Sequence, residues 1–126
     1  MDIIAEIKER LKKYPNLPVN SDSNTVSVKP ENGFTVWAES QGNLITIGFE
    51  GWHEEFDNPE EALNCFAWGL SNECRIKVVS RGGKPHKWVV QRLENGSWVN
   101  ESTVGLLFFQ FWRRKSTKYV QNAVIS

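Results

Sequence analysis

Apolar and polar residues alternate along much of this chain, and this period of two restricts its fold more than any other feature. The alternation is clearest at Phe34-Val36-Ala38 and Ile45-Ile47-Phe49, on either side of Gln41-Gly42-Asn43. Successive side chains of a strand point to opposite faces, so each run predicts a half-buried strand and the segment between them predicts a hairpin turn. After Phe49 the parity changes, and we attribute this change to a bulge at Gly51.

Two stretches follow the helical period instead. Ile3, Ile4, Ile7 and Leu11 recur at helical spacing and predict an amphipathic helix that Pro15 stops. Asp57-Asn58-Pro59-Glu60-Glu61 predicts the start of a second helix, because it supplies a capping side chain, a proline in the first turn and acids at the positive end of the helix dipole.

Strand patterns return after the second helix, at 74–78, 88–90 and 98–99. In the tail, residues 106–112 are apolar at both parities, which predicts a strand covered on both faces that forms a last hairpin with 118–125. The order of elements predicts an α+β protein with two helices packed on one face of a mostly antiparallel, strongly curved sheet, in the order α-β-β-β-(β)-α-β-β-β-β-β. At this length, we expect residues 1–126 to form a single domain.

The charges of the chain are segregated, although its formal net charge is zero. Nine acids and no Lys or Arg lie between Glu31 and Glu73, whereas residues 74–126 contain ten Lys and Arg against Glu94 and Glu101. Such a distribution predicts separate positive and negative territories that steer partners. Our leading hypothesis is therefore a non-enzymatic module that binds another protein through its polarised surface, or that self-associates through the 106–112 strand.

The segment 75–92 contains six basic residues and no acid. We expect a three-residue loop at Gly82-Gly83, which would pair Val78 with His86 and Ile76 with Trp88. The opposite face would be basic, as in platforms that bind single-stranded nucleic acid, although charged strands also simply discourage aggregation. The alternative function is nucleic-acid binding through 75–92 and 113–118, and the candidate binding residues are Arg75, Lys77, Arg81, Lys84, Lys87, Arg113 and Arg114.

The order helix, three strands, helix in the first half resembles double-stranded RNA-binding domains in topology only. Those domains bring a cluster of lysines to the start of their second helix. This chain has Asn58-Pro59-Glu60-Glu61 there, and acids would repel phosphate. We therefore expect no binding of double-stranded RNA through this half.

A third hypothesis places a small hydrolase or metal site at 53–57, where His53, Glu54, Glu55 and Asp57 gather. A histidine beside a carboxylate can act as an acid–base pair. However, acids just before a helix also serve its cap and dipole, and no known metal-binding spacing is present. We expect no catalytic residue, no metal and no cofactor.

The compartment follows from the start of the chain and its apolar runs. Residues 1–12 lack the basic start and continuous apolar run of a signal peptide, and 106–112 is too short to span a bilayer. We expect a soluble, cytoplasmic protein. Arg113-Arg114-Lys115 is suited to anionic lipid, but no amphipathic helix supports that interpretation, so a membrane partner is not expected.

Overall fold

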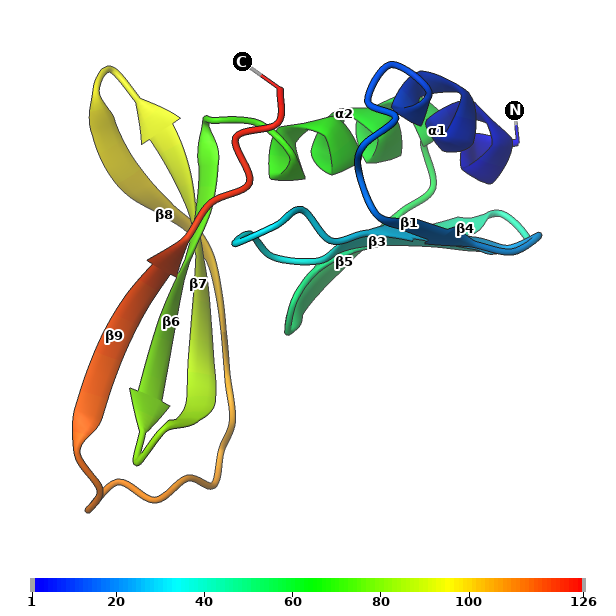
Figure 1. Ribbon diagram of the computed structural model, residues 1–126. Coiled ribbons are helices and arrows are strands. Elements are labelled where there is room, and N and C mark those ends of the chain that lie inside the picture. Colours follow the sequence, from blue (N-terminus) through cyan, green and yellow to red (C-terminus); the bar gives the residue numbers. More distant parts are fainter. Residues whose placement is uncertain (1, 126) are drawn as a thin grey trace.

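The computed structural model describes residues 2–125, which form two helices and nine strands in two antiparallel sheets (Figure 1). The α+β class predicted from the sequence is confirmed, with two sheets in place of the single, strongly curved sheet that we expected. The elements are α1 (Ile3–Leu11), β1 (Val19–Ser21), β2 (Thr25–Val28), β3 (Val36–Gln41), β4 (Leu44–Phe49), β5 (Trp52–Phe56), α2 (Pro59–Gly69), β6 (Cys74–Arg81), β7 (Lys84–Glu94), β8 (Ser97–Gly105) and β9 (Lys115–Val120).

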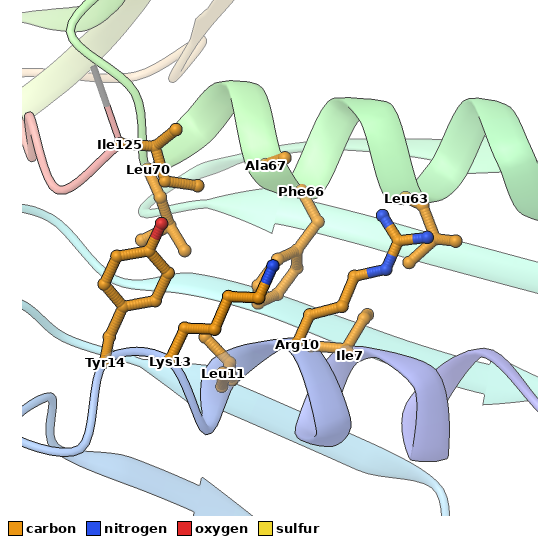
Figure 2. A pocket seen from close by; sticks show the side chains of 10 residues that line it. All are labelled: Ile7, Arg10, Leu11, Lys13, Tyr14, Leu63, Phe66, Ala67, Leu70 and Ile125. Carbon is orange, nitrogen blue, oxygen red and sulfur yellow. The ribbon is translucent and has the colours of Figure 1, made fainter.

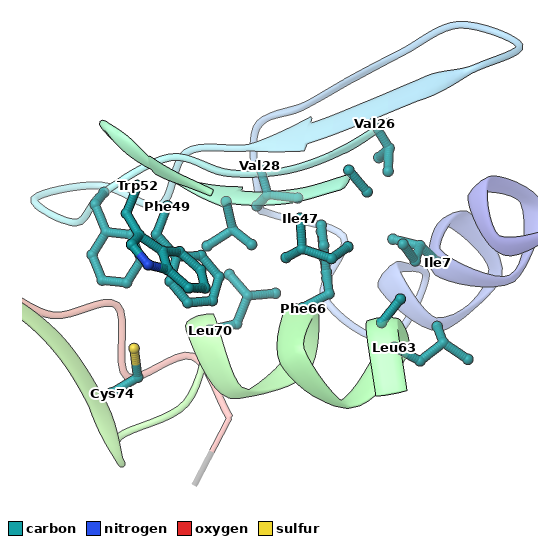
Figure 3. Close-up of a cluster of buried hydrophobic side chains, with 14 of the residues drawn as sticks. Ile7, Val26, Val28, Ile47, Phe49, Trp52, Leu63, Phe66, Leu70 and Cys74 are labelled. Carbon is teal, nitrogen blue, oxygen red and sulfur yellow. The ribbon is translucent and has the colours of Figure 1, made fainter. Parts of the chain in front are cut away.

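The first sheet has the strand order β1-β2-β3-β4-β5, and both helices lie on the same face of it (Figure 1). The apolar positions of β2 to β5 point toward the helices and form the main core (Figure 3), whereas β1 is exposed along its length. Phe49 lies at its centre, with its ring centroid 4.8 Å from that of Trp52 and 5.7 Å from that of Phe34. Phe49 also packs on Trp68 of α2, with 5.8 Å between their ring centroids, which helps to hold this helix on the sheet.

The second helix begins where the sequence predicts. The Asn58 side chain accepts hydrogen bonds from the backbone N–H groups of Glu60 and Glu61, at 2.9 and 3.2 Å. Pro59 is the first helical residue, and its missing N–H costs nothing there because that group would have no partner within the helix. In the sequence, α2 separates β5, the last strand of the first sheet, from β6, the first strand of the second sheet.

The change of parity after Phe49 is caused by a hairpin turn, and the bulge predicted at Gly51 is wrong. Phe49 pairs with Trp52, which leaves Glu50 and Gly51 as a two-residue turn between β4 and β5. Glu50 has a φ of 51°, in the left-handed region that such turns require. The turn adds β5 as an edge strand, and β5 carries the 53–57 acids.

The second sheet has the order β8-β7-β6-β9 and extends well beyond the first sheet (Figure 1). Residues 79–87 and 105–117 form its far end, which we call the tip. The last hairpin predicted from the sequence is wrong, because β9 pairs with β6 and lies at the opposite edge from β8. Three strand spacings of ~4.8 Å separate β8 from β9, so the chain between them crosses about 14 Å at the end of the sheet.

The segment 106–112 is a loop in this structure, and the strand predicted there is wrong. At one end the Leu106 N–H donates to the His86 carbonyl at 2.7 Å, and at the other the Gly82 N–H donates to the Arg114 carbonyl at 3.0 Å. Between these two bonds no neighbouring strand remains, because β6 and β7 already end in their own turn. The 106–112 segment, although apolar at both parities, therefore has no neighbouring strand with which to form backbone hydrogen bonds.

The β6–β7 hairpin has a two-residue turn, so the predicted three-residue loop is wrong. Arg81 pairs with Lys84 across Gly82-Gly83, and an irregularity near Ser80 leaves His86 as an extra residue on β7. Val78 therefore pairs with Trp88 and Ile76 with Val90. The bulge restores the parity that a plain two-residue turn would have broken, so the basic face forms as expected.

The chain end ties the two sheets together through Asn122. Its Oδ1 accepts a hydrogen bond from the Phe34 N–H at 2.8 Å, and its Nδ2 donates to the Gly69 carbonyl at 2.9 Å. One side chain thereby satisfies backbone groups of the β2–β3 connection and of the end of α2. Such partly buried bonds matter because an unpaired backbone group is costly.

Candidate binding site on the second sheet

The outer face of the second sheet carries the basic residues of β6 and β7. Pairing of Lys77 with Val89 and of Val79 with Lys87 puts cations and small apolar side chains alternately on this face. On β9, Lys115 pairs with Arg81 and adds a further cation. The inner face carries the buried Ile76 and Val90, which join the main core.

Four of these cations surround a cup of about 370 Å³ on the outer face. Lys77, Arg81, Lys87 and Lys115 line it, with the buried Val79 and Val89 among its lining residues. Leu106 and Phe109 close it on the side of the 106–112 loop. A cavity with four positive side chains and no acid among its lining residues is suited to an anion.

His86 is the most buried polar group of the cup, since only 8% of the residue is exposed. Its ring stacks on Phe109 with 4.0 Å between centroids, and its Nε2 has no hydrogen-bond partner in the described structure. Loss of solvent, and then the charges of Arg81, Lys87 and Lys115, lower the pKa of His86 below its ordinary value. The His86 imidazole is therefore mainly neutral at pH 7, and its Nε2 is a buried nitrogen without a partner among the described residues.

Arg75 lies apart from the cup and is held between two aromatic rings. Its guanidinium carbon is 4.3 Å from the centre of the Trp98 ring and 4.2 Å from that of Tyr119. Its Nε donates to Gln91 Oε1 at 2.6 Å, and Gln91 in turn bonds to Asn100. This stack puts two rings on the basic face, where sequence reasoning had found none, because it did not have the register of β8 and β9.

The structure brings together only some of the predicted binding residues. Lys77, Arg81 and Lys87 meet at the cup, which overlaps the tip at Arg81 and Lys87, whereas the tip residues Lys84, Arg113 and Arg114 do not line it. Arg81 Nη1 also donates to the Arg113 carbonyl at 3.3 Å, which fastens the end of the loop to the hairpin. Sequence reasoning missed His86 and Phe109 as cup residues, since neither the bulge nor the path of the loop is visible in the pattern.

The tip combines exposed apolar side chains with cations that have no ion-pair partner among the described residues. Its six cations are accompanied by no acid, and no ion pair of the described residues includes any of them. Arg92, at the other end of the sheet, pairs instead with Glu94 at 3.2 Å and Glu101 at 2.9 Å. The covering expected over 106–112 is absent within residues 2–125, where Leu107 is 84% and Phe108 is 88% exposed.

The 53–57 segment covers most of β5 at the edge of the first sheet and the residue that follows it, and none of its residues lines the cup. His53, Glu54 and Glu55 are all exposed on the edge strand β5, and the nearest ring to His53 is that of Trp37 at 6.3 Å. Across residues 2–125, no three His, Cys, Asp or Glu side chains are grouped closely enough to hold a metal ion.

Both cysteines lie near α2 and carry free thiols. Burial, and then the charge of Glu54, raises the pKa of Cys65 to about 12. Burial also raises the pKa of Cys74. Because the thiolate is the reactive form, neither thiol is a nucleophile at neutral pH.

A second cavity of about 230 Å³ lies between α1 and α2 (Figure 2). Ile7, Leu63 and Phe66 supply its apolar wall, and Arg10 of α1 and Lys13 of the turn after it reach past the cavity. Arg10 is held by Glu6 at 2.9 Å. This cavity is a gap between two amphipathic helices, and its polar groups belong to the helix surface.

Comparison with models of protein families, with curated proteins and with solved structures gave no match for this chain. Within residues 2–125, neither helix has the length and apolar character needed to cross a membrane. Function is therefore inferred from the geometry of the second sheet.

Proposed function

We propose that this protein is a non-enzymatic binding module that attaches to a negatively charged partner through the tip and the adjacent cup. The observation that carries the proposal is the set of six tip cations without an acid or an ion pair among the described residues. Like charges gathered in one place repel each other and oppose the compact state. An external anion removes this repulsion, so binding is favoured most strongly at this site.

The proposal keeps the charge-polarised module predicted from the sequence but changes its contact residues. The sequence placed the contact on a strand at 106–112, whereas the cations around that segment now carry it. A non-enzymatic role is supported by the raised pKa of Cys65 and by the exposed position of His53 on β5. Neither residue has the activated surroundings that nucleophilic or acid–base catalysis requires.

Retention on immobilised heparin as a function of salt tests this proposal. We expect the double variant Arg113→Glu/Arg114→Glu to elute at lower salt than the wild type, and its slope of log retention against log salt to fall by about 2. The matched control is Lys8→Glu/Lys13→Glu on the α1 side, which makes the same change in net charge. Equal losses in the two double variants would mean that net charge alone, and not the tip, governs binding.

A second candidate, single-stranded nucleic acid on the outer face, is favoured by the Arg75 stack. Tyr119 is exposed beside the Arg75 guanidinium, and an exposed ring is a platform on which a base can stack. If this candidate is correct, Tyr119→Ala weakens binding of a fluorescent single-stranded oligonucleotide by roughly fivefold or more in an anisotropy titration. Unchanged affinity, with Tyr14→Ala in the segment after α1 as the control, would remove it.

A further inference from the structure

The 106–112 loop exposes an unusual concentration of large apolar side chains. Leu107, Phe108 and Trp112 are 84%, 88% and 68% exposed, and Leu106 and Phe111 are also largely exposed. Isolated apolar side chains on a surface need no explanation, but a contiguous group of them marks an interaction site. The loop is thus built to be covered by something outside the described chain.

The position of the loop limits what can cover it. The loop crosses the free end of the second sheet, remote from both helices and from the first sheet (Figure 1). Arg113 and Arg114 follow it directly, and Lys84 lies on the neighbouring β6–β7 turn. A projecting apolar segment is therefore bordered by cations, with no acid anywhere in 79–87 or 105–117.

We propose that the 106–112 loop inserts into the interface of an anionic lipid bilayer while the tip cations contact lipid phosphates. This inference rests on the proposed function and names its partner. Trp side chains favour the boundary between headgroups and acyl chains, Phe and Leu supply apolar area that enters the acyl layer, and basic residues are attracted to the negative surface of such a membrane. The apolar side chains of the tip match the acyl region of the membrane, and the tip cations match the headgroup phosphates.

Other occupants match the tip less well. A second copy docked tip to tip would bring twelve cations together, and juxtaposed like charges oppose association. Nucleic acid would satisfy the cations and its bases would stack on the exposed rings, but it would leave the aliphatic side chains of Leu106 and Leu107 in water. At protein interfaces Lys is depleted, whereas Lys84 and Lys115 border this loop.

The expectation of no membrane partner assumed that 106–112 was a strand and that only an amphipathic helix could reach lipid. A loop with apolar side chains on all sides needs no such helix. Its backbone stays at the headgroup level, where water and phosphate satisfy its polar groups, and only side chains enter the apolar layer.

Co-sedimentation of the purified protein with lipid vesicles tests the inference. One set of vesicles contains phosphatidylcholine and phosphatidylglycerol in equal amounts, and the other contains phosphatidylcholine alone. We expect binding to the first set only, and a loss of roughly tenfold or more in Leu107→Ser/Phe108→Ser, which removes the two most exposed apolar side chains of the loop. The matched control is Leu44→Ser, which replaces an exposed leucine on β4 of the first sheet. Thermal unfolding confirms that each variant is folded.

Heparin retention of the same variants separates this inference from the proposed function. We expect Leu107→Ser/Phe108→Ser to keep wild-type retention, and Arg113→Glu/Arg114→Glu to elute from heparin at lower salt and to bind vesicles more weakly. Retention on heparin without vesicle binding, or vesicle binding that survives Leu107→Ser/Phe108→Ser, overturns the lipid inference alone. Loss of neither activity in Arg113→Glu/Arg114→Glu overturns the proposed function as well, and tighter binding to single-stranded oligonucleotide than to vesicles assigns the tip to nucleic acid.

Discussion

The core of the first sheet and the tip of the second sheet use the same residue types and treat them in opposite ways. Phe34 and Phe49 are fully buried under the helices, whereas Phe108 and Phe111 are exposed at the end of the second sheet. The difference lies in pattern and cover. Phe49 alternates with polar neighbours on a strand that two helices cover, but 106–112 is apolar at both parities and has no element above it. Hydrophobicity alone therefore does not locate a core.

Charge separates the same two regions. Among the described residues, the ion pairs of the helix side join local partners such as Glu6 and Arg10, and none joins the 31–73 segment to the 74–125 segment. The tip cations consequently keep their full positive charge. The first sheet and its helices, whose side chains are packed and paired within the fold, provide stability. The tip, whose cations and apolar side chains lack such partners, is free for binding.

The largest effect is expected from Phe49→Ala. Phe49 contacts Phe34, Trp52 and Trp68 with ring centroids 4.8 to 5.8 Å apart, so its truncation leaves a cavity at the centre of the core. We expect the free energy of unfolding to fall by about 3–5 kcal/mol in urea denaturation. A loss below about 1 kcal/mol would show that this core is not the main source of stability.

A smaller loss is expected from Asn122→Ala, which removes the bonds to the Phe34 N–H and the Gly69 carbonyl. Two partly buried backbone groups then lack partners, and we expect a loss of about 1–3 kcal/mol. The control is Gln121→Ala, because Gln121 makes only one exposed bond, to the Asn72 carbonyl at 2.7 Å. Equal losses in both variants would contradict the role of Asn122 in joining the sheets.

The pH dependence of stability tests the surroundings of His86. Because the pKa of His86 is lowered in the fold, the unfolded chain takes up this proton more readily than the folded protein does. The free energy of unfolding should therefore fall as the pH drops below the ordinary value of 6.5, and level off below the folded pKa. His86→Gln should remove this part of the pH dependence. Parallel curves for the wild type and His86→Gln would mean that the cup does not disfavour the charged ring.

The smallest effect on stability is expected from Phe108→Ala, the matched opposite of Phe49→Ala. Phe108 is 88% exposed, so its truncation leaves no cavity, and the free energy of unfolding should change by less than about 0.5 kcal/mol. Urea denaturation of the two variants side by side gives the difference directly. A large loss in Phe108→Ala would place the loop in the core.

The sequence predicted the local elements well where a single physical cause acts on adjacent residues. The α2 cap at Asn58, the α1 stripe and the β3–β4 hairpin each depend on near neighbours in the chain, and each forms as expected. The basic face of β6 also forms, because strand parity alone determines which side chains share a face.

Long-range pairing could not be predicted in this way. That β9 pairs with β6 depends on which edge is vacant, and residues 115–120 contain no signal for that choice. The bulge at His86 and the turn at Glu50-Gly51 each shift parity by one, and in the sequence alone a turn and a bulge give the same shift. The cup forms only where β9 and the 106–112 loop meet the β6–β7 hairpin. The sequence therefore predicted only the three cup cations that lie on that hairpin.

The accessibility of residue 108 tests the central claim most directly, through the reaction of Phe108→Cys with a thiol reagent. The native thiols provide the internal reference, because burial raises the pKa of Cys65 to about 12 and Cys74 is fully buried. We predict that the new thiol reacts about as fast as a free cysteine in solution, while Cys65 and Cys74 react far more slowly in the same sample. A thiol at position 108 that reacts as slowly as the two native cysteines would show that the tip is packed, and would contradict its assignment as a free binding surface.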